Sequence, residues 1–426
     1  MIIRNFKSLS TNSAKKDAIS IIEAGLTAAD PKIYLSKIIK KNTLILPRRR
    51  ISIGKYQHVF VISTGKAGLA MACAVDSLTH IDGGIIVVPD KIKTMTKKFK
   101  VIQAGHPIPN NTSLIAAKTI LEFLDKTDSG DLVIFLISGG TSSLVAMPDG
   151  ITLDEKRGTT DLLIKCGASI QEINCIRKHL SKVKGGKILE HIRSDSISLV
   201  MSDVVGDDLS SIASGMTYYD KSTFAEAKKI LKKYHLERLV PKNVVSHLDK
   251  GVQGIIPETP KHEKIKNYII ATNKDCLDAM KLRAKGLGYS SKILAGVTGD
   301  VQDLSYDITR AFSDKKKNCL IFGGESTVVV TGTGKGGRNQ ELVLHCAINL
   351  SRKKKSAIVS SVGTDGIDGV TSHAGAIWQS DRKIDKIKSY LDKNNSNGFF
   401  KKYGGFIKTG ATGTNLMDVG LVLRKQ

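Results

Sequence analysis

The chain alternates short apolar runs with amphipathic segments along most of its length. Apolar residues that recur every three or four positions predict amphipathic helices, whereas continuous apolar runs of four to eight residues predict buried strands. Helices are predicted at residues 14–29, 69–78, 111–124, 223–234, 274–288 and 338–350. Strands are predicted at residues 58–63, 85–89, 131–138, 198–204, 267–272, 291–296, 319–330 and 357–363. Strands that are apolar on both faces are typical of a parallel sheet covered by helices, so the pattern predicts an α/β fold.

One segment, residues 251–265, breaks this alternation with two prolines, two glycines and few consecutive apolar residues. A chain of 426 residues is also long for one domain, since a domain commonly takes roughly 100–200 residues. We therefore expect two α/β domains with mostly parallel sheets. They are a Rossmann-like N-terminal domain of residues 1–255 and a smaller C-terminal α/β domain of residues 256–426.

The charge of the chain is strongly positive, with 65 Lys and Arg against 40 Asp and Glu and a formal net charge of +25. The basic residues are scattered, and only 5% of the residues are aromatic. A nucleic-acid-binding protein usually gathers its basic residues on one element, often with aromatic side chains that stack on bases. The distribution therefore predicts a largely solvated basic surface, with the excess charge favouring anionic small molecules.

Membrane insertion, secretion and disulfide bonding all lack support in the sequence. No apolar run reaches the ~18 residues of a membrane helix, and the N-terminus lacks a basic stretch followed by an apolar core. The six cysteines form no C-x-x-C pair. These features predict a protein of the reducing cytoplasm.

Two glycine-rich loops in the first half follow predicted strands, where open α/β sheets place their ligands. In STGKAG (63–68), Lys66 stands where the strand turns into a helix and could hold an anion. In SGGTSSL (138–144), consecutive small residues let backbone amides converge on phosphate oxygens, with three hydroxyls as further donors. A plain turn and an ordinary helix cap remain the alternative interpretations.

A third loop, GTGKGGRNQE (332–341), contains the glycine spacing of a dinucleotide-binding loop. The acid that would bind a ribose about 20 residues later is absent, which disfavours a nicotinamide site. Lys335 and Arg338 are what distinguish this loop, since an arginine there can donate several N–H groups to a phosphoryl oxygen or a carboxylate.

Acidic residues follow two further strands. GTDGIDG (363–369) offers Asp365 and Asp368, and SDVVGDD (202–208) offers Asp203. Such acids can hold Mg²⁺ together with substrate phosphates, although aspartate in a glycine-rich turn is common for conformational reasons alone. Together with Lys66 and Arg338 they supply the parts that phosphoryl transfer needs, because that reaction depends on positioning and charge neutralisation.

The motifs taken in order resemble the class II glycerate kinases, whose C-terminal half is called the MOFRL domain. The resemblance covers nearly the whole chain and rests on STGKAG, GHPIPN, LISGGTSSL, SDVVGDD, GGESTVVVTGTGKGGRNQE, GTDGIDG and TGATGTNLMD. It implies ATP-dependent phosphorylation of D-glycerate, with Mg²⁺, in a cleft between two α/β domains. It favours 2-phosphoglycerate as the product, so the implied enzyme is a glycerate 2-kinase.

The resemblance also implies roles for individual residues. Lys66 and Arg338 match the proposed catalytic pair of the family, and Asp203 matches an active-site acid that could take the proton of the substrate hydroxyl. Which of the two cations anchors the glycerate carboxylate stays open. The expected nucleotide-binding residues are Ser138, Gly139, Gly140, Thr141, Ser142, Ser143, Gly323, Glu325 and Asn339. The expected Mg²⁺ ligands are Asp365 and Asp203.

Two other functions compete with this interpretation. A nicotinamide-dependent hydroxypyruvate reductase would need the ribose-binding acid that the third loop lacks. A basic nucleic-acid-binding protein would show affinity that falls steeply with salt, but no recognised motif supports it. We expect small-molecule partners, D-glycerate and ATP, with neither nucleic acid nor membrane, in a monomer or a homodimer.

Overall fold

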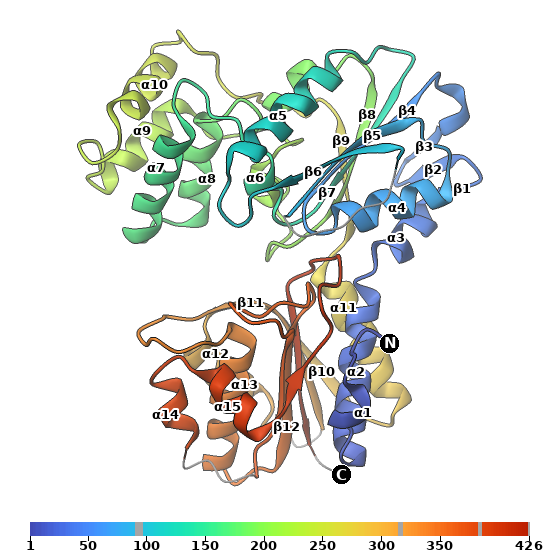
Figure 1. The fold of residues 1–426 in the computed structure, drawn as a ribbon, viewed down its shortest axis with the longest axis vertical. Coiled ribbons are helices and arrows are strands. Elements are labelled where there is room, and N and C mark those ends of the chain that lie inside the picture. Colours follow the sequence, from blue (N-terminus) through green and yellow to red (C-terminus); the bar gives the residue numbers. More distant parts are fainter. Residues whose placement is uncertain (90–96, 314–317, 382–385, 425–426) are drawn as a thin grey trace. The chain divides into compact units, whose positions relative to one another are not determined.

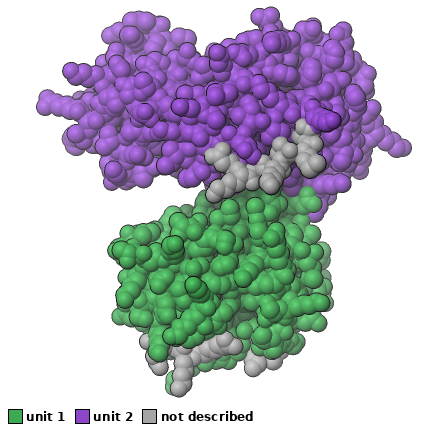
Figure 2. Space-filling view, viewed as in Figure 1, with its two compact units in different colours: residues 1–30, 271–426 green, residues 31–270 purple. Residues whose placement is uncertain are grey.

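The computed structural model describes residues 1–89, 97–313, 318–381 and 386–424. The chain forms two compact units (Figure 2): unit 1 comprises residues 1–30 and 271–426, and unit 2 comprises residues 31–270. This division differs from the expected boundary at 255/256, because the first 30 residues join the C-terminal part of the chain. Within the described ranges, no helix is long and apolar enough to cross a membrane.

Unit 2 is built on a six-stranded sheet with the order β6-β5-β4-β7-β8-β9 (Figure 1). The strands are β4 (Val59–Thr64), β5 (Gly83–Pro89), β6 (Phe99–Ala104), β7 (Leu132–Ile137), β8 (Asp195–Met201) and β9 (Lys266–Ala271). Strands β4 to β8 pair in parallel, and every residue of β7 is buried. The helices α4 (Gly68–Leu78) and α5 (Asn111–Leu124) pack against this sheet.

The remaining elements of unit 2 form two smaller assemblies. Four helices share an apolar core of their own that includes Leu163, Ile176 and Phe224. They are α7 (Leu153–Lys165), α8 (Ile170–His179), α9 (Phe224–Lys233) and α10 (Lys242–Val252). A small antiparallel sheet follows α3 (Pro31–Ile38), with β1 (Ile39–Lys40), β2 (Thr43–Leu46) and β3 (Arg49–Ser52). Short helical segments are α6 (Thr141–Leu144), η1 (Ile53–Lys55), η2 (Lys187–His191) and η3 (Ile212–Ser214).

Unit 1 is built on a six-stranded sheet with the order β10-β11-β15-β12-β13-β14. The strands are β10 (Ser291–Asp300), β11 (Cys319–Thr327), β12 (Ala357–Gly363), β13 (Gly375–Gln379), β14 (Phe406–Ile407) and β15 (Asp418–Arg424). β10 and β11 are parallel, but β15 runs antiparallel to both β11 and β12. The expected α/β class is confirmed, and the parallel sheet is found in unit 2. The sheet of unit 1 is mixed, because the last strand enters between β11 and β12 in the opposite direction.

Helices cover both faces of the sheet in unit 1 (Figure 1). One layer contains α12 (Val301–Ala311), α13 (Arg338–Arg352), α14 (Ile387–Leu391) and α15 (Ser396–Tyr403), and the other contains α1 (Phe6–Leu9), α2 (Ser13–Ala28) and α11 (Asn273–Gly286). The N-terminal α2 packs along α11 and against β15. The Tyr289 hydroxyl donates to Asp17 at 2.9 Å, and a Cβ at Gly25 would lie 2.7 Å from Met280. These contacts explain why residues 1–30 belong to unit 1.

Candidate active site

Three of the predicted loops, 63–68, 138–144 and 202–208, lie in unit 2 and meet at one edge of its sheet. Because β4, β7 and β8 are adjacent and parallel, their carboxyl ends lie at the same edge. Lys66 follows β4, the loop 138–143 follows β7, and Asp203 follows β8. The structure therefore brings these three features together, as the sequence predicted for ligands of an open α/β sheet.

The loop that carries Lys66 is fixed directly on the neighbouring glycine turn. The backbone N–H of Lys66 donates to the carbonyl of Gly139 at 2.8 Å, and the N–H of Ala67 donates to the Ser138 hydroxyl at 3.0 Å. Gly65 adopts φ +114°, and a Cβ there would lie 2.2 Å from Ser138 Oγ. Only glycine permits both this backbone conformation and this approach, so the two loops form one rigid surface.

Within the loop 138–143, the backbone provides the free donors. The hydroxyls of Thr141 and Ser143 donate to carbonyls of the same turn at 2.7 and 3.0 Å. In contrast, no hydrogen bond joins the N–H groups of Gly139, Gly140 or Ser142 to any residue that the structure describes. Converging unpaired amides are what an anion-binding turn presents. The hydroxyls of Thr141 and Ser143 thus stabilise the turn itself, and the three backbone N–H groups are its available donors.

Two residues that the sequence analysis did not assign to the site also contact this turn. A Cβ at Gly140, which has φ +89°, would lie 3.0 Å from the His106 ring. Lys184 donates to the carbonyl and hydroxyl oxygens of Ser142 at 2.5 and 2.7 Å, although it keeps only 2% of its surface exposed. Its segment, IRKHLSKVKGGK (176–187), is dense in basic residues, and that density was the signal available in the sequence.

In unit 1, Arg338 is held by two carboxylates at the first turn of α13. Its Nε and Nη2 donate to the two oxygens of Asp418 at 2.6 and 3.0 Å, and its Nη1 donates to Glu325 at 2.8 Å. Burial disfavours the charge of Arg338, but these carboxylates outweigh burial and raise its pKa. A bidentate pair of this kind fixes the plane of the guanidinium. Arg338 therefore presents a charged, oriented group with 33% of its side chain exposed.

Asp418 is the residue of this group that sequence reasoning missed. It begins β15 and is buried between β11 and β12. Burial raises its pKa to about 6, against the lowering effect of Arg338. Asp365 lies nearby, since a Cβ at Gly363 would be 3.0 Å from Asp365 Oδ1 and 3.4 Å from Asp418 Oδ1. Arg338 thus lies in a distinctly acidic environment.

The start of α13 is already occupied by a carboxylate of the protein itself. Asp368 accepts hydrogen bonds from the backbone N–H groups of Asn339 and Gln340, both at 2.9 Å. A Cβ at Gly337 would lie 2.3 Å from Asp368 Cγ, so glycine is needed to admit this carboxylate. The positive end of the helix is therefore neutralised internally, whereas a dinucleotide site would offer it to the pyrophosphate.

The other glycines of the third loop also serve internal packing. A Cβ at Gly332 or Gly334 would approach the backbone of Lys393 to 2.5 Å or less. The N–H of Gly334 donates to the Lys393 carbonyl at 2.9 Å, and the Lys335 carbonyl accepts from Asn397 at 2.9 Å. The dinucleotide-like spacing thus reflects close contact with the segment before α15, and the loop is anchored there.

Two residues expected on the nucleotide side lie in the interior of unit 1. A Cβ at Gly323 would lie 2.3 Å from Asn273 Oδ1. Asn339 is 1% exposed, and its Oδ1 accepts from the Ser361 hydroxyl at 2.6 Å. Both positions support the fold around Arg338. Glu325 is the third residue of unit 1 that was expected to bind the nucleotide. Its side chain is 48% exposed and is therefore accessible to a ligand.

Comparison with known proteins places this architecture in a family. Residues 318–418 match the MOFRL family, and residues 17–249 match a family described as a domain of unknown function (DUF4147). Glycerate 2-kinase of Pyrococcus horikoshii is 36% identical over 95% of this chain and 96% of that protein. The chain belongs to the glycerate kinase family. The family resemblance of the sequence motifs is thereby confirmed.

Further relatives of the glycerate kinase family support this assignment. D-glycerate 2-kinase of Thermotoga maritima is 35% identical over 96% of this chain and 99% of that protein. A crystal structure of glycerate kinase from Thermotoga maritima superposes with a TM-score of 0.82 at 34% identity, covering 96% of this chain and 99% of that chain. Sequence and fold therefore agree over nearly the full length.

The expected metal ligands of this glycerate kinase family member lie in different units, with Asp203 in unit 2 and Asp365 in unit 1. Among the residues that the structure describes, no group of three or more His, Cys, Asp or Glu is arranged to hold a metal ion. Mg²⁺ commonly takes only one or two carboxylates and completes its shell with phosphate oxygens and water.

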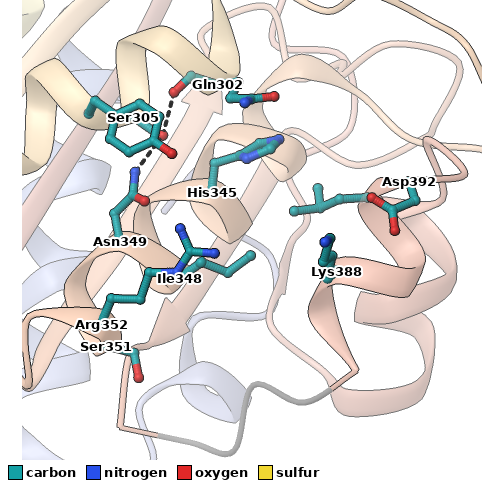
Figure 3. Close-up of a pocket in the computed structure, with 11 residues that line it drawn as sticks. Gln302, Ser305, His345, Ile348, Asn349, Ser351, Arg352, Lys388 and Asp392 are labelled. Carbon is teal, nitrogen blue, oxygen red and sulfur yellow. Dashed lines mark hydrogen bonds between the residues drawn. The ribbon is translucent and has the colours of Figure 1, made fainter.

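Two cavities of unit 1 differ in their relation to these residues. A cavity of about 290 Å³ is lined by Arg338, Glu341 and Val330, next to the third loop. Burial raises the pKa of Glu341 to about 7. Another cavity, of about 450 Å³, lies between α12, α13 and α14 and is lined by residues including His345 and Arg352 (Figure 3). None of the predicted site residues lines this second cavity.

Proposed function

We propose that the protein is a glycerate 2-kinase, which transfers the γ-phosphoryl group of ATP to the 2-hydroxyl of D-glycerate and yields 2-phosphoglycerate and ADP. One observation carries the proposal. The turn at Gly139 and Gly140 presents unpaired backbone amides beside Lys66, at the edge of a parallel sheet where ligands of open α/β sheets bind. Membership of the glycerate kinase family supports the substrate.

Each group then has a chemical task. The amides of the turn 138–143 hold phosphoryl oxygens, and Lys66 neutralises charge on them. Asp203 accepts the proton of the attacking hydroxyl, which makes that oxygen a better nucleophile. Arg338, oriented by Asp418, binds either the glycerate carboxylate or the transferring group. Preorganised charges of this kind contribute most of the rate acceleration in phosphoryl transfer.

Mg²⁺ fits this donor set as a cofactor bound mainly by ATP. Asp203 of unit 2 and Asp365 of unit 1 are the carboxylates that would each offer it a single ligand. When bound, the metal would supply positive charge that offsets the charge of the phosphoryl groups. The chain's own contribution is to fix the phosphoryl oxygens and the acceptor hydroxyl.

The direct experiment incubates the protein with ATP, Mg²⁺ and D-glycerate and records phosphorus NMR spectra of the product. We expect the resonance of 2-phosphoglycerate and an equal amount of ADP. A resonance of 3-phosphoglycerate would refute the assigned position, and no glycerate-dependent ADP would refute the kinase. L-glycerate serves as the control for stereochemistry.

A nicotinamide-dependent hydroxypyruvate reductase remains the alternative to exclude by assay. The carboxylate of Asp368 at the start of α13 disfavours it, because it occupies the place of the pyrophosphate. We expect no hydroxypyruvate-dependent loss of NADH absorbance.

The six cysteines are free, which supports our placement of the enzyme in the reducing cytoplasm.

A further inference from the structure

Unit 2 contains a buried basic cluster behind the loop 138–143, formed by Lys156, Arg177, Lys184 and Lys187. The three lysines keep 5%, 2% and 7% of their surface exposed. Lys156 and Lys184 both lie within electrostatic reach of Arg177. The cluster joins α7, α8 and the segment that follows α8, and its closest contact with the loop is that of Lys184 with Ser142.

Most of this positive charge has no counter-charge. Lys156 donates to the carbonyl of Leu180 at 2.9 Å, and Lys184 donates only to Ser142. Among the described residues, no carboxylate lies within 4.0 Å of Lys156, Arg177 or Lys184. Lys187 approaches Asp149 at 3.6 Å, and the same carboxylate also attracts Lys156 electrostatically. No other carboxylate of the described residues forms an ion pair with the cluster.

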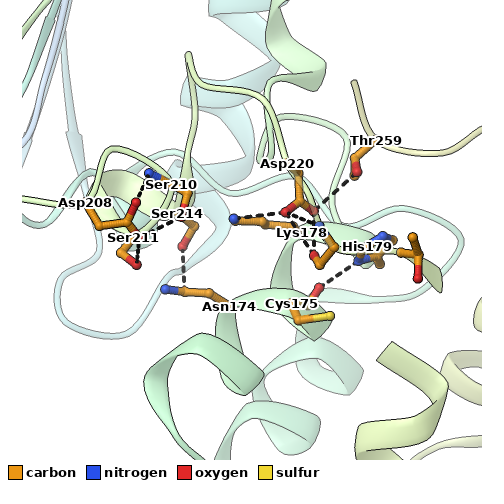
Figure 4. A network of polar contacts seen from close by, with 12 residues as sticks. Asn174, Cys175, Lys178, His179, Asp208, Ser210, Ser211, Ser214, Asp220 and Thr259 are labelled. Atoms are coloured by element: carbon orange, nitrogen blue, oxygen red, sulfur yellow. Dashed lines mark hydrogen bonds and ion pairs between the residues drawn. The ribbon is translucent and has the colours of Figure 1, made fainter. Parts of the chain in front are cut away.

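A neighbouring lysine of the same segment is buried as well, but its charge is paired with a carboxylate. Lys178 forms an ion pair with Asp220 at 3.2 Å, and both side chains are nearly inaccessible (Figure 4). Asp220 also accepts hydrogen bonds from the hydroxyls of Ser222 and Thr259. The charge of Lys178 is thus fully compensated, in contrast to that of Lys184.

Burying a cation without a partner is costly, because the charge loses its hydration and gains no compensating charge. Accordingly, burial lowers the pKa of Lys156 and Lys184 well below the ordinary value. Such an arrangement is stabilised when an anion binds against it. Arg177 is suited to meet that anion, because it is partly exposed and has no hydrogen-bond partner among the described residues.

We propose that the buried basic cluster is the counter-charge for phosphoryl oxygens bound at the loop 138–143. This inference rests on the proposed kinase function and assigns it a further binding element. Arg177 donates directly to the phosphoryl group, since its planar fork suits bidentate contact with phosphate. Lys184 acts as a positioning residue, because it holds Ser142 and places a buried positive charge behind the turn.

The ligand chemistry is a phosphoryl group, which either the nucleotide or the phosphorylated product can supply. Calorimetric titrations with ADP and with 2-phosphoglycerate, carried out on the wild type and on variants of the cluster, distinguish these sources. The ligand whose affinity depends on the cluster identifies the occupant. D-glycerate, which carries no phosphate, is the matched third titrant.

The decisive variants are Arg177→Met and Lys184→Met in the full-length protein. For each we expect about 10- to 100-fold weaker binding of one of the two phosphorylated ligands, the usual effect of losing a hydrogen bond between charged groups. Binding of D-glycerate should be unchanged. Circular dichroism without ligand should match that of the wild type, because Arg177 is partly exposed and the contacts of Lys184 are confined to Ser142.

Two lysines of the same segment serve as controls. Lys182→Met removes an exposed charge and should leave affinity and activity unchanged. Lys178→Met removes a paired charge, so it should lower the melting temperature by leaving Asp220 unpaired.

The inference is overturned if Arg177→Met and Lys184→Met bind both phosphorylated ligands with wild-type affinity. It is also overturned if D-glycerate binding weakens equally, which would indicate a general structural role. Failure of the kinase proposal is recognised separately, by the absence of glycerate-dependent ADP release in the wild type.

Discussion

The pairing of Arg338 with Asp418 leads to a prediction about both stability and catalysis. Replacing Asp418 with Asn keeps the size of the side chain but removes its charge. One amide oxygen then replaces two carboxylate oxygens, and an N–H group faces a guanidinium that can only donate. Arg338 would lose the bidentate contact that fixes its plane and would keep at most one bond to the amide oxygen, together with the bond to Glu325.

The size of the effect follows from the burial of the two partners. Removing one member of a fully buried ion pair costs about 3–5 kcal/mol. Asp418 is buried, but 33% of the Arg338 side chain is exposed, so water compensates part of the loss. We expect a decrease of about 2 kcal/mol in the free energy of unfolding of unit 1. Because a displacement of ~1 Å can cost about 100-fold in rate, we expect kcat to fall by a similar factor.

The pH dependence tests the same contact. Burial raises the pKa of Asp418 to about 6, so this carboxylate becomes protonated and releases Arg338 as the pH falls through 6. The wild-type kcat/KM should therefore decline below pH 6, and Asp418→Asn should lack that part of the decline.

Urea denaturation and a coupled ADP-release assay measure both quantities, with Glu325→Gln as the matched control. Glu325 is half exposed and provides a single bond, so its loss should cost less than about 1 kcal/mol. The reasoning would be refuted if the two substitutions lowered the free energy of unfolding equally. It would also be refuted if Asp418→Asn kept the wild-type kcat.

Two further predictions concern Lys66 and Glu341. Lys66→Ala should lower kcat by about 100-fold or more, as expected for the loss of one preorganised charge. Circular dichroism and the melting temperature should stay unchanged. Near-normal turnover would show that Lys66 is not a catalytic residue. Burial raises the pKa of Glu341 from 4.5 to about 7, so the folded state binds the extra proton and stability falls as the pH rises from 4.5 to 7. Glu341→Gln should abolish this pH-dependent decrease in the free energy of unfolding, which amounts to at most about 3 kcal/mol. Urea midpoints at pH 5 and pH 8 would then be closer in the variant than in the wild type, and an unchanged difference would contradict the assignment.

Local patterns predicted the elements of this fold well. The helix expected at 111–124 and the strand expected at 357–363 have the same bounds as α5 and β12. The position of Lys66 at a strand-to-helix turn was also predictable from the sequence, because a glycine-rich junction after an apolar run constrains the backbone locally. These features depend on neighbours in the sequence, which is why the sequence alone sufficed.

Contacts between distant segments could not be predicted in the same way. Arg338 and Asp418 are 80 positions apart, and no local pattern connects them. The assignment of residues 1–30 to unit 1 depends on the packing of α2 against α11, which a boundary drawn from composition could not reveal. Lys184 resembled a surface lysine in the sequence, because burial of a long polar side chain is decided by tertiary packing.

The discontinuous composition of unit 1 has a consequence during protein synthesis. Helix α2 is made first, but its packing partner α11 emerges only after all of unit 2, residues 31–270, has been translated. At ~5–20 residues per second, this delay is on the order of ten seconds or more. During that time α2, whose buried residues include Ile19, Ile22 and Leu26, lacks its packing partners α11 and β15. Unit 2 can therefore fold while the nascent chain still carries an exposed apolar helix, a state in which chaperones would be expected to bind the N-terminus.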